Sequence, residues 1–304
     1  MNTKGITIMN VNKYLENILR DQTLPADGEE LKNLRAERKN VEALLRREFK
    51  DCPPNIRYGG SMAKGTMIRE AYDLDLPSYF GRKDTAAGET LKDIFNNVKA
   101  ALEKEYYVTP KTSALRLRPK DGKGDFHIDV VPGRFVDGED GDVFIYQDQA
   151  DKHRLLTNLD THIEHIRDSH LVDAVRLVKL WRERNQLGVK TFVLELLVVD
   201  LLKNKKGASL ETQLKHVWTE FRDNSENLTV EDPANPTGND LTGYLDSVRS
   251  ALAMSARVTL TRVDSDNWTS IFGQVEDVSE ENQAASLGRI AAAVTTREKP
   301  WCNG

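Results

Sequence analysis

The segment Gly59-Gly-Ser-Met-Ala-Lys-Gly-Thr66, followed closely by Asp73-Leu-Asp-Leu76, decides how this sequence is interpreted. Residues 55–58 and 72–80 alternate between apolar and polar side chains, which predicts two strands joined through a glycine turn and a short helical turn. Glycines where a strand meets a helix leave backbone N–H groups exposed, and Ser61 adds a hydroxyl, so this turn is predicted to cradle phosphate. It is not a Walker motif, because the Gly-Lys-Ser/Thr ending is missing.

Three aspartates are predicted to form a metal site. Asp73 and Asp75 are two residues apart in an alternating segment, so both carboxylates project to the same side. Asp129 lies in a second alternating segment, 126–131, and the three carboxylates meet if the two strands are neighbours. All-oxygen ligands suit Mg²⁺ or Mn²⁺, and two such ions can activate an attacking hydroxyl and stabilise a leaving pyrophosphate. An Asp-x-Asp pair alone also occurs in exposed turns, so the combination with the glycine turn carries the prediction.

Composition limits the class of protein. The chain has 304 residues, 39% hydrophobic and 30% charged, which is enough to bury a substantial core. A net charge of −5 and a pI of about 5.8 argue against a protein that coats nucleic acid. The two cysteines lack zinc-site spacing. No signal pattern opens the sequence and the longest apolar stretch, 192–202, is too short for a bilayer, so we expect no membrane contact and a cytoplasmic location.

The periodicity changes near the middle of the chain. The first half reads as two helices within residues 10–50, a helix at 89–105, and strands at 114–118 and 126–131. Beyond Asp151 the pattern is helical almost throughout, with segments at 151–168, 170–186, 190–203 and 208–223 and more helix after a proline loop at 232–238. We therefore predict an α+β protein in which residues 1–150 form a lobe with a mixed sheet, residues 151–304 form a helical lobe, and the two lobes pack around a cleft.

Six blocks of sequence, in a fixed order, resemble the oligoadenylate synthetases and the related bacterial CD-NTases, which are cyclic-oligonucleotide synthases similar to cyclic GMP-AMP synthase. The blocks cover residues 59–69, 73–76, 129–132, 176–181, 191–197 and 232–239. This resemblance implies a polymerase-β-like nucleotidyltransferase lobe followed by a helical lobe, which agrees with the prediction from periodicity.

The resemblance also implies roles for the residues in the first three blocks. Gly60 and Ser61 would contact the donor triphosphate. Asp73, Asp75 and Asp129 would be the catalytic metal ligands, with Asp129 nearest to the attacking ribose hydroxyl, where it could bind the metal or accept the proton.

Three further residues are candidates for contact with phosphate. Lys179 resembles the family lysine that reaches the phosphates from the helical lobe, although it could also be a surface lysine of an amphipathic helix at 172–184. Thr191 has the position of a phosphate-contacting serine found in many bacterial members, and it keeps the hydroxyl. Lys64 could touch phosphate or only support the glycine turn.

The resemblance implies an enzyme that joins nucleoside triphosphates, ATP among them, into a cyclic di- or trinucleotide second messenger of bacterial antiphage (CBASS) signalling. Two other enzymes are alternatives. One is a linear oligoadenylate synthetase, and the other is an RNA 3′-end nucleotidyltransferase of the CCA-adding type, which shares the Gly-Ser and Asp-x-Asp blocks. A binding-only protein that has kept the fold is a third alternative, and the three intact aspartates argue against it.

The sequence also bears on partners. The acidic charge and the short basic cluster at 203–206 argue against activation by double-stranded nucleic acid. Control by a regulatory protein fits better. The resemblance further suggests that Gly304 is joined to a target by a ubiquitin-transfer-like protein, as in some CD-NTases, with a frayed tail of no function as the alternative.

Overall fold

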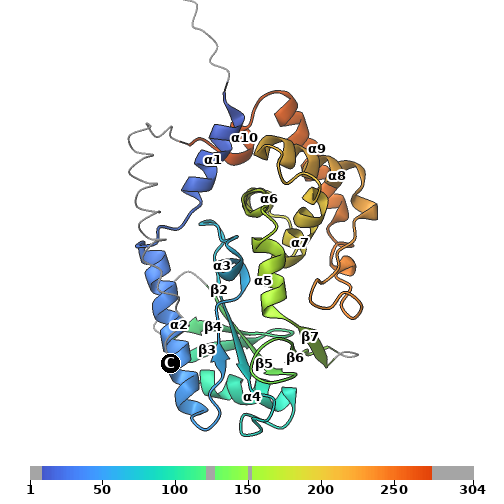
Figure 1. Cartoon of the computed structure of the whole chain (residues 1–304). Helices are drawn as coiled ribbons and strands as arrows, with labels where there is room; N and C mark the ends of the chain where they lie inside the picture. The colour runs from blue at the N-terminus through green and yellow to red at the C-terminus, as the bar shows by residue number, and fades with distance from the viewer. Residues whose placement is uncertain (1–8, 121–126, 150–152, 276–304) are drawn as a thin grey trace, which may run out of the picture.

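The computed structural model describes residues 9–120, 127–149 and 153–275. Within them the chain forms two lobes that lie one above the other in Figure 1. One lobe contains the sheet with helices α2 and α4, and the other contains most of the remaining helices. This arrangement is compatible with the predicted cleft between a sheet lobe and a helical lobe.

The sheet is mixed, as predicted. Within the described residues it has seven strands, in the order β1-β2-β5-β4-β3, and β6 pairs with β5 and β7 with β6. Strands β2 and β5 run parallel, and every other recorded strand pair in the described residues is antiparallel. The strands are β1 (Asn55–Ile56), β2 (Leu74–Phe80), β3 (Tyr106–Pro110), β4 (Leu115–Pro119), β5 (Ile128–Phe135), β6 (Val143–Tyr146) and β7 (Arg154–Thr157).

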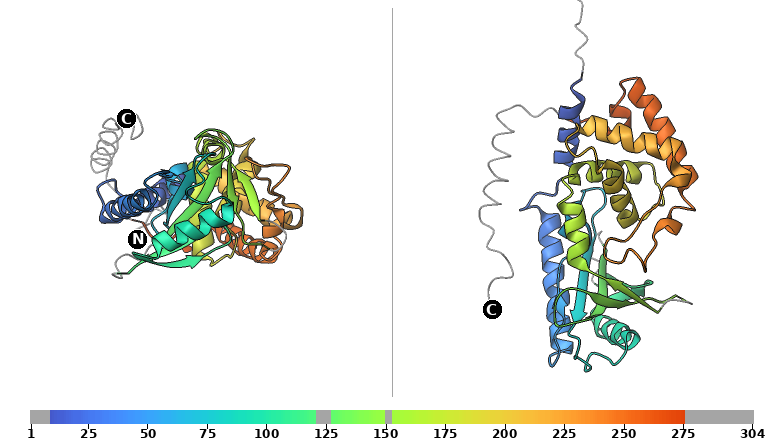
Figure 2. Two further views of the ribbon diagram at one scale, coloured as in Figure 1. Left: turned by 90° about the horizontal axis from the view of Figure 1, so that it is seen from below. Right: turned by 45° about the vertical axis from the view of Figure 1, so that its right-hand side comes forward.

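Two helices cover one face of this sheet, α2 (Glu29–Glu48) and α4 (Leu91–Leu102) (Figure 2). Helix α4 starts with a capping box between Thr90 and Asp93, which satisfies N–H groups of its first turn. Alternate residues of the central strands pack into the core below these helices, among them Leu74, Leu76, Ile128 and Val130. Because side chains alternate along a strand, the residues between them, including Asp75 and Asp129, face the other side of the sheet.

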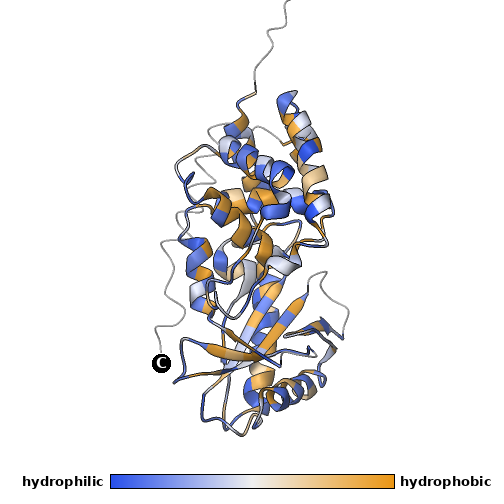
Figure 3. Ribbon diagram, turned by 90° about the vertical axis from the view of Figure 1, so that its right-hand side faces the viewer, coloured by the Kyte–Doolittle hydropathy of each residue, from blue (hydrophilic) through white to orange (hydrophobic). Residues whose placement is uncertain are grey.

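The helical lobe has its own core. Its elements are α5 (Leu159–Arg167), α6 (Val172–Arg184), α7 (Thr191–Leu202), α8 (Leu210–Asp223), η1 (Ser225–Asn227), η2 (Thr242–Tyr244), α9 (Arg249–Asp264) and α10 (Thr269–Phe272). Trp218 lies at the centre, with ring centroids 6.1 Å from Trp181 and 5.8 Å from Trp268. Figure 3 shows hydrophobic colour concentrated on the inner helices of this lobe. No helix among the described residues is long and apolar enough to cross a membrane.

Helix α1 (Val11–Asp21) packs on the helical core although it comes first in the chain. Leu15 is fully buried there, and the Tyr14 hydroxyl donates a hydrogen bond to Gly273 O at 2.7 Å. The predicted division of the chain at residue 150 stays a prediction, since residues 150–152 lie outside the described part. The structure adds that the helical core also takes in a helix from the first half.

The prediction of a helix over 151–168 was wrong in its first part. Arg154–Thr157 forms β7, which pairs with β6, and α5 begins at Leu159 with Asn158 as its N-cap. The run Arg-Leu-Leu-Thr carries no strong preference for helix or strand, so pairing with β6 decides its conformation. Strands β3 and β6 were not predicted either. The other predicted helices and strands are present in the described residues, with their ends shifted by a few residues.

Candidate active site

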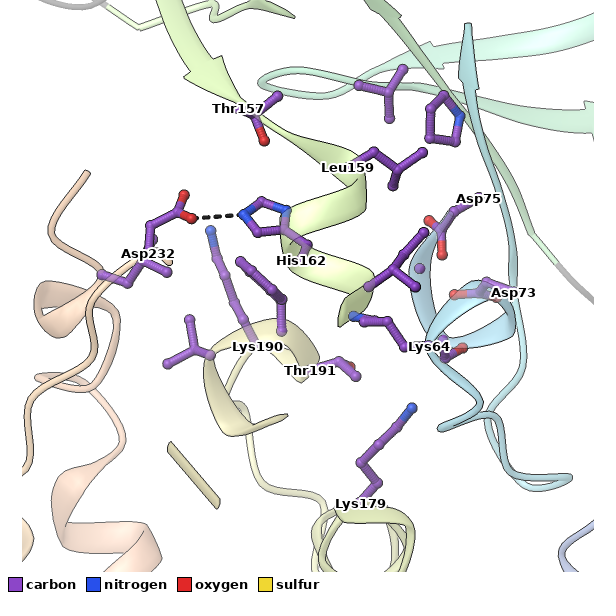
Figure 4. A pocket seen from close by; sticks show the side chains of 18 of the residues that line it. Lys64, Asp73, Asp75, Thr157, Leu159, His162, Lys179, Lys190, Thr191 and Asp232 are labelled. Atoms are coloured by element: carbon purple, nitrogen blue, oxygen red, sulfur yellow. Dashed lines mark hydrogen bonds and ion pairs between the residues drawn. The ribbon is translucent and has the colours of Figure 1, made fainter. Parts of the chain in front are cut away.

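A pocket of about 750 Å³ lies between the two lobes. One wall comes from α3 (Gly60–Lys64) and the start of β2. The others come from β7, from helices α5 to α7, and from residues 232–244. Figure 4 shows several of these side chains. Seven of the eight predicted site residues line the pocket: Gly60, Ser61, Lys64, Asp73, Asp75, Lys179 and Thr191. The eighth, Asp129, lies on the neighbouring strand.

The glycine turn lies directly against the carboxylates. Gly59 N donates a hydrogen bond to Asp75 O at 2.9 Å, which ties the turn to the edge of β2. Gly60 has a φ of 53°, in the left-handed region that favours glycine. A Cβ atom added at Gly60 would stand 1.6 Å from Asp75 Oδ2. Both the backbone conformation and the available space therefore require glycine at position 60.

The three aspartates come together as predicted from neighbouring strands. Asp75 and Asp129 are register partners in the parallel pair of β2 and β5, and Asp73 lies one residue before β2. His127 N donates to Asp73 Oδ1 at 3.4 Å. Burial, followed by the negative charge of Asp129, raises the pKa of Asp75 to about 6. Negative charge is thus concentrated at this edge of the pocket, and the nearby charge of Lys64 offsets only part of the shift.

Asp129 is held by an arginine from the next strand. Arg116 on β4 donates from Nε to Asp129 Oδ1 at 2.8 Å and from a terminal nitrogen to Oδ2 at 2.6 Å. Within the described residues no three His, Cys, Asp or Glu side chains stand in metal-binding geometry. The donor set nevertheless fits a hard divalent ion in its chemistry: Asp75 and Asp129 are register partners, Asp73 lies two residues before Asp75, and burial together with the charges of Asp129 and Asp73 raises the pKa of Asp75.

Lys64 and Lys179 share one buried glutamate. Glu195 on α7 is fully buried and pairs with Lys64 through Oε2 and with Lys179 through Oε1, the latter at 3.2 Å. Lys179 also donates to Thr66 O at 2.7 Å, and the Thr66 hydroxyl donates to Glu195 Oε1 at 2.5 Å. Lys179 is therefore not a surface lysine. Two ammonium groups on one carboxylate leave a surplus positive charge at the wall of the pocket.

The pKa values in this cluster follow from burial and charge. Burial lowers the pKa of Lys179, and the charge of Glu195 opposes that shift. Burial alone would raise the pKa of Glu195, but the charges of Lys64 and Lys179 outweigh it and the pKa is lowered. The cluster joins α3 of the sheet lobe to α6 and α7 of the helical lobe, so it also fixes how the two walls of the pocket meet.

Comparison with known proteins finds relatives that are named as synthases or cyclases of oligonucleotides. Models of known protein families give no match. The chain is 27% identical over 242 residues to a cyclic AMP-AMP-AMP synthase of Escherichia coli MS 115-1, covering 67% of this chain and 70% of that one. It is 24% identical over 301 residues to the CBASS oligonucleotide cyclase CdnC of Escherichia coli KTE188, covering 89% and 93%.

Solved structures give the same fold. The CdnC of E. coli MS115-1 in complex with HORMA-deltaN has a TM-score of 0.67 at 19% identity, with 87% of this chain and 98% of that chain covered. The Vibrio cholerae DncV cyclic AMP-GMP synthase has a TM-score of 0.69 at 15% identity, with 89% and 98% covered. These sequence relatives and structural neighbours are bacterial CD-NTases, the family that the sequence blocks resemble. The chain is accordingly a nucleotidyltransferase with the α+β, polymerase-β-like fold expected from the sequence.

The pocket also has residues that were not predicted from the sequence. His162 on α5 contacts Asp232 in the segment that follows η1, and Lys190 and Tyr244 lie at the same end. A single histidine on an amphipathic helix carries no signal of its own, and only the fold brings it to Asp232. Asp232, the first residue of the proline loop at 232–238, lines the pocket.

Proposed function

We propose that this protein condenses nucleoside triphosphates into a cyclic di- or trinucleotide, with release of pyrophosphate, as a second messenger of CBASS defence. The observation that carries the proposal is the register of Asp75 opposite Asp129, directly beside the turn at Gly60. The names of the sequence relatives support a cyclic product, and nothing in the comparisons favours a linear synthetase or an RNA 3′-end enzyme.

In this proposal Asp73, Asp75 and Asp129 hold Mg²⁺ or Mn²⁺. When bound, the ions lower the pKa of the attacking hydroxyl and stabilise the negative charge on the leaving pyrophosphate. Asp129 lies on the side of the acceptor ribose and receives or orients the proton of its hydroxyl. The raised pKa of Asp75 supports a cation in this place, because a divalent ion relieves the repulsion between the carboxylates.

The triphosphate of the donor lies along the other wall. Backbone and hydroxyl groups of Gly60 and Ser61 contact its terminal phosphates, and Thr191 adds a hydroxyl from the start of α7. Lys64 and Lys179 contribute the surplus positive charge of their cluster with Glu195, which offsets the charge that develops on the leaving pyrophosphate.

ATP is proposed as one substrate and a regulatory protein as a partner. A structure of CdnC with ATP and the complex of CdnC with HORMA-deltaN support these two assignments for this chain. The proposed conjugation at Gly304 lies outside the described residues and stays a prediction from sequence.

The test is a product assay. The purified protein is incubated with all four labelled nucleoside triphosphates and Mg²⁺ or Mn²⁺, and the products are treated with phosphatase and identified by mass spectrometry. We expect a phosphatase-resistant product that contains adenosine. A product with a phosphatase-sensitive 5′ end would favour the linear synthetase, and extension of added RNA would favour the 3′-end enzyme.

The double variant Asp73→Asn with Asp75→Asn tests catalysis by two metal ions. It is expected to abolish synthesis while the melting temperature stays near that of the wild type. Asp140→Asn, in an exposed turn of the same lobe, serves as the control and should keep full activity. Synthesis by the double variant at the wild-type rate would refute the proposed mechanism.

A further inference from the structure

The end of the pocket away from Asp73 and Asp75 carries a second polar group. Asp232 has only 1% of its surface exposed and accepts a hydrogen bond from His162 Nε2 at 2.6 Å and another from Asn239 Nδ2 at 2.7 Å. Figure 4 shows His162 and Asp232 facing each other, apart from the two metal-site aspartates. Bonds from several directions fix the carboxylate of Asp232, and through it the orientation of the imidazole.

The contacts of Asp232 determine which nitrogen of His162 donates to it. Burial opposes ionisation of Asp232, but the hydrogen bonds from His162 and Asn239 outweigh it and hold the pKa of Asp232 below its usual range. An ionised carboxylate only accepts hydrogen bonds, so Nε2 of His162 must carry the hydrogen. In the neutral imidazole, Nδ1 then presents a lone pair. Among the described residues Nδ1 has no hydrogen-bond partner.

Aromatic rings lie at the same end of the pocket as His162. Its ring lies 4.7 Å from the ring of Phe192, measured between centroids. Tyr244 is 38% exposed and lines the same end, with Lys190 Nζ 3.5 Å from the centre of its ring. Leu241 completes this part of the wall. A space bounded by aromatic rings with one hydrogen-bond acceptor suits a planar heterocycle that carries an amino group.

We infer that His162, oriented by Asp232, accepts a hydrogen bond from the exocyclic amino group of the adenine of a bound ATP. This inference rests on the proposed function, since it concerns the base end of the same pocket. His162 would be the residue that selects the base, and Asp232 a positioning residue that fixes the donor and acceptor nitrogens of the imidazole. A base with a carbonyl group at the corresponding place would set two acceptors against each other and bind less well.

The experiment compares ATP with purine riboside triphosphate, which lacks only the amino group of adenine. Binding to the full-length protein is measured by calorimetry with Ca²⁺ in place of Mg²⁺, so that turnover is suppressed. We expect the wild type to bind ATP about fivefold to tenfold more tightly than the purine analogue, the effect of one net hydrogen bond. His162→Ala should bind the two ligands equally, so that the coupling between residue and amino group disappears.

Two controls separate base selection from a structural role. His165→Ala removes an exposed histidine from the same helix and should leave the preference for ATP unchanged. Binding of inorganic tripolyphosphate, which has no base, should be the same in the wild type and in His162→Ala. Asp232→Asn should reduce the preference for ATP less than His162→Ala does, and His162→Gln, whose amide can both donate and accept, should restore part of it.

The outcomes are distinct. A preference for ATP that persists in His162→Ala, or that is absent from the wild type, overturns the inference. An equal loss of tripolyphosphate binding in His162→Ala also overturns it, because His162 would then only maintain the shape of the pocket. If the wild type binds no nucleoside triphosphate, the proposed function fails and the inference with it; nucleotide binding without base preference leaves the proposed function intact.

Discussion

Arg116 and Asp129 face each other across strands β4 and β5, and the guanidinium binds both oxygens of the carboxylate at 2.8 and 2.6 Å. Such a two-point contact fixes the rotation of a carboxylate as well as its position. Arg116 was not among the residues predicted from the sequence. If Asp129 acts on the attacking hydroxyl as proposed, Arg116 determines how that carboxylate is presented.

Arg116→Ala is therefore expected to lower the maximal rate of product formation about tenfold while the affinity for ATP changes little, because Asp129 remains in place as a metal ligand and only its orientation toward the attacking hydroxyl is lost. Arg116→Lys should be intermediate, since an ammonium cannot bridge both oxygens. Arg118→Ala removes an exposed arginine two residues along the same strand and should behave as wild type. Steady-state rates at saturating ATP check this, and equal rates for Arg116→Ala and Arg118→Ala would contradict it.

Gly60→Ala should nearly abolish activity. Its Cβ would stand 1.6 Å from Asp75 Oδ2, so either the carboxylate or the turn must move. Gly65 is a matched control, because it also has a positive φ, 75°, but an added Cβ meets nothing nearer than Val172 at 4.0 Å. Gly65→Ala should lose about 1 kcal/mol of stability from backbone strain and keep most of its activity. Product assays and chemical denaturation of both variants test the contrast.

Glu195→Gln should be strongly destabilising. It leaves the ammonium groups of Lys64 and Lys179 buried without a counter-charge, and loss of one partner from a buried ion pair costs about 3–5 kcal/mol. Asp200→Asn on the same helix removes an exposed pair with Lys203 and should change the free energy of unfolding by less than about 1 kcal/mol. Urea denaturation measures both, and a Glu195→Gln protein as stable as Asp200→Asn would count against a structural role for the cluster.

The stability of the metal-free protein should depend on pH through Asp75. Its folded pKa of about 6 lies above the ordinary 3.8, so the folded state binds the proton more tightly and stability falls as pH rises from about 4 to about 6. Above pH 6 the difference between the folded and the ordinary pKa corresponds to about 3 kcal/mol of destabilisation. Asp75→Asn should thus be the more stable protein at pH 7.5 in EDTA, and its advantage should shrink toward pH 4.5.

Added Mg²⁺ provides the internal check on that prediction. It should raise the melting temperature of the wild type at pH 7.5 and leave Asp75→Asn nearly unchanged, because only the ionised carboxylate binds the ion. A difference between the two proteins that is constant from pH 4.5 to 7.5 would show that Asp75 does not titrate in this range.

Local sequence patterns predicted most of the fold and the centre of the site. Alternation in residues 72–80 and 126–131 placed Asp75 and Asp129 on one face of adjacent strands, and their pairing is confirmed. Arg154–Thr157 was misassigned because a four-residue run has no clear period and its partner strand, β6, had not been predicted. Short strands of this kind are set by pairing rather than by their own sequence.

Contacts between distant residues could not be predicted from local patterns. Glu195 lies 131 positions from Lys64, and Asp232 lies 70 positions from His162. In the sequence, each of these residues is an ordinary polar or charged group on a helix or in a loop. Only tertiary packing determines its partner. The blocks of family resemblance pointed to Lys64 and Lys179 as candidates for phosphate contact but did not reveal that one buried carboxylate holds both.

The packing of α1 on the helical core has a consequence for synthesis of the protein on the ribosome. Leu15 and Tyr14 leave the exit tunnel early, but their partners, including Trp268 and Gly273, follow some 250 residues later. Helices α6 and α8, which also pack against α1, are made before these residues but after the whole sheet lobe. The helices of the sheet lobe can meet their strands within the first half of translation. The nascent chain should therefore complete the sheet lobe first, and α1 should dock once α6 and α8 have been made, with its contacts to Trp268 and Gly273 formed last.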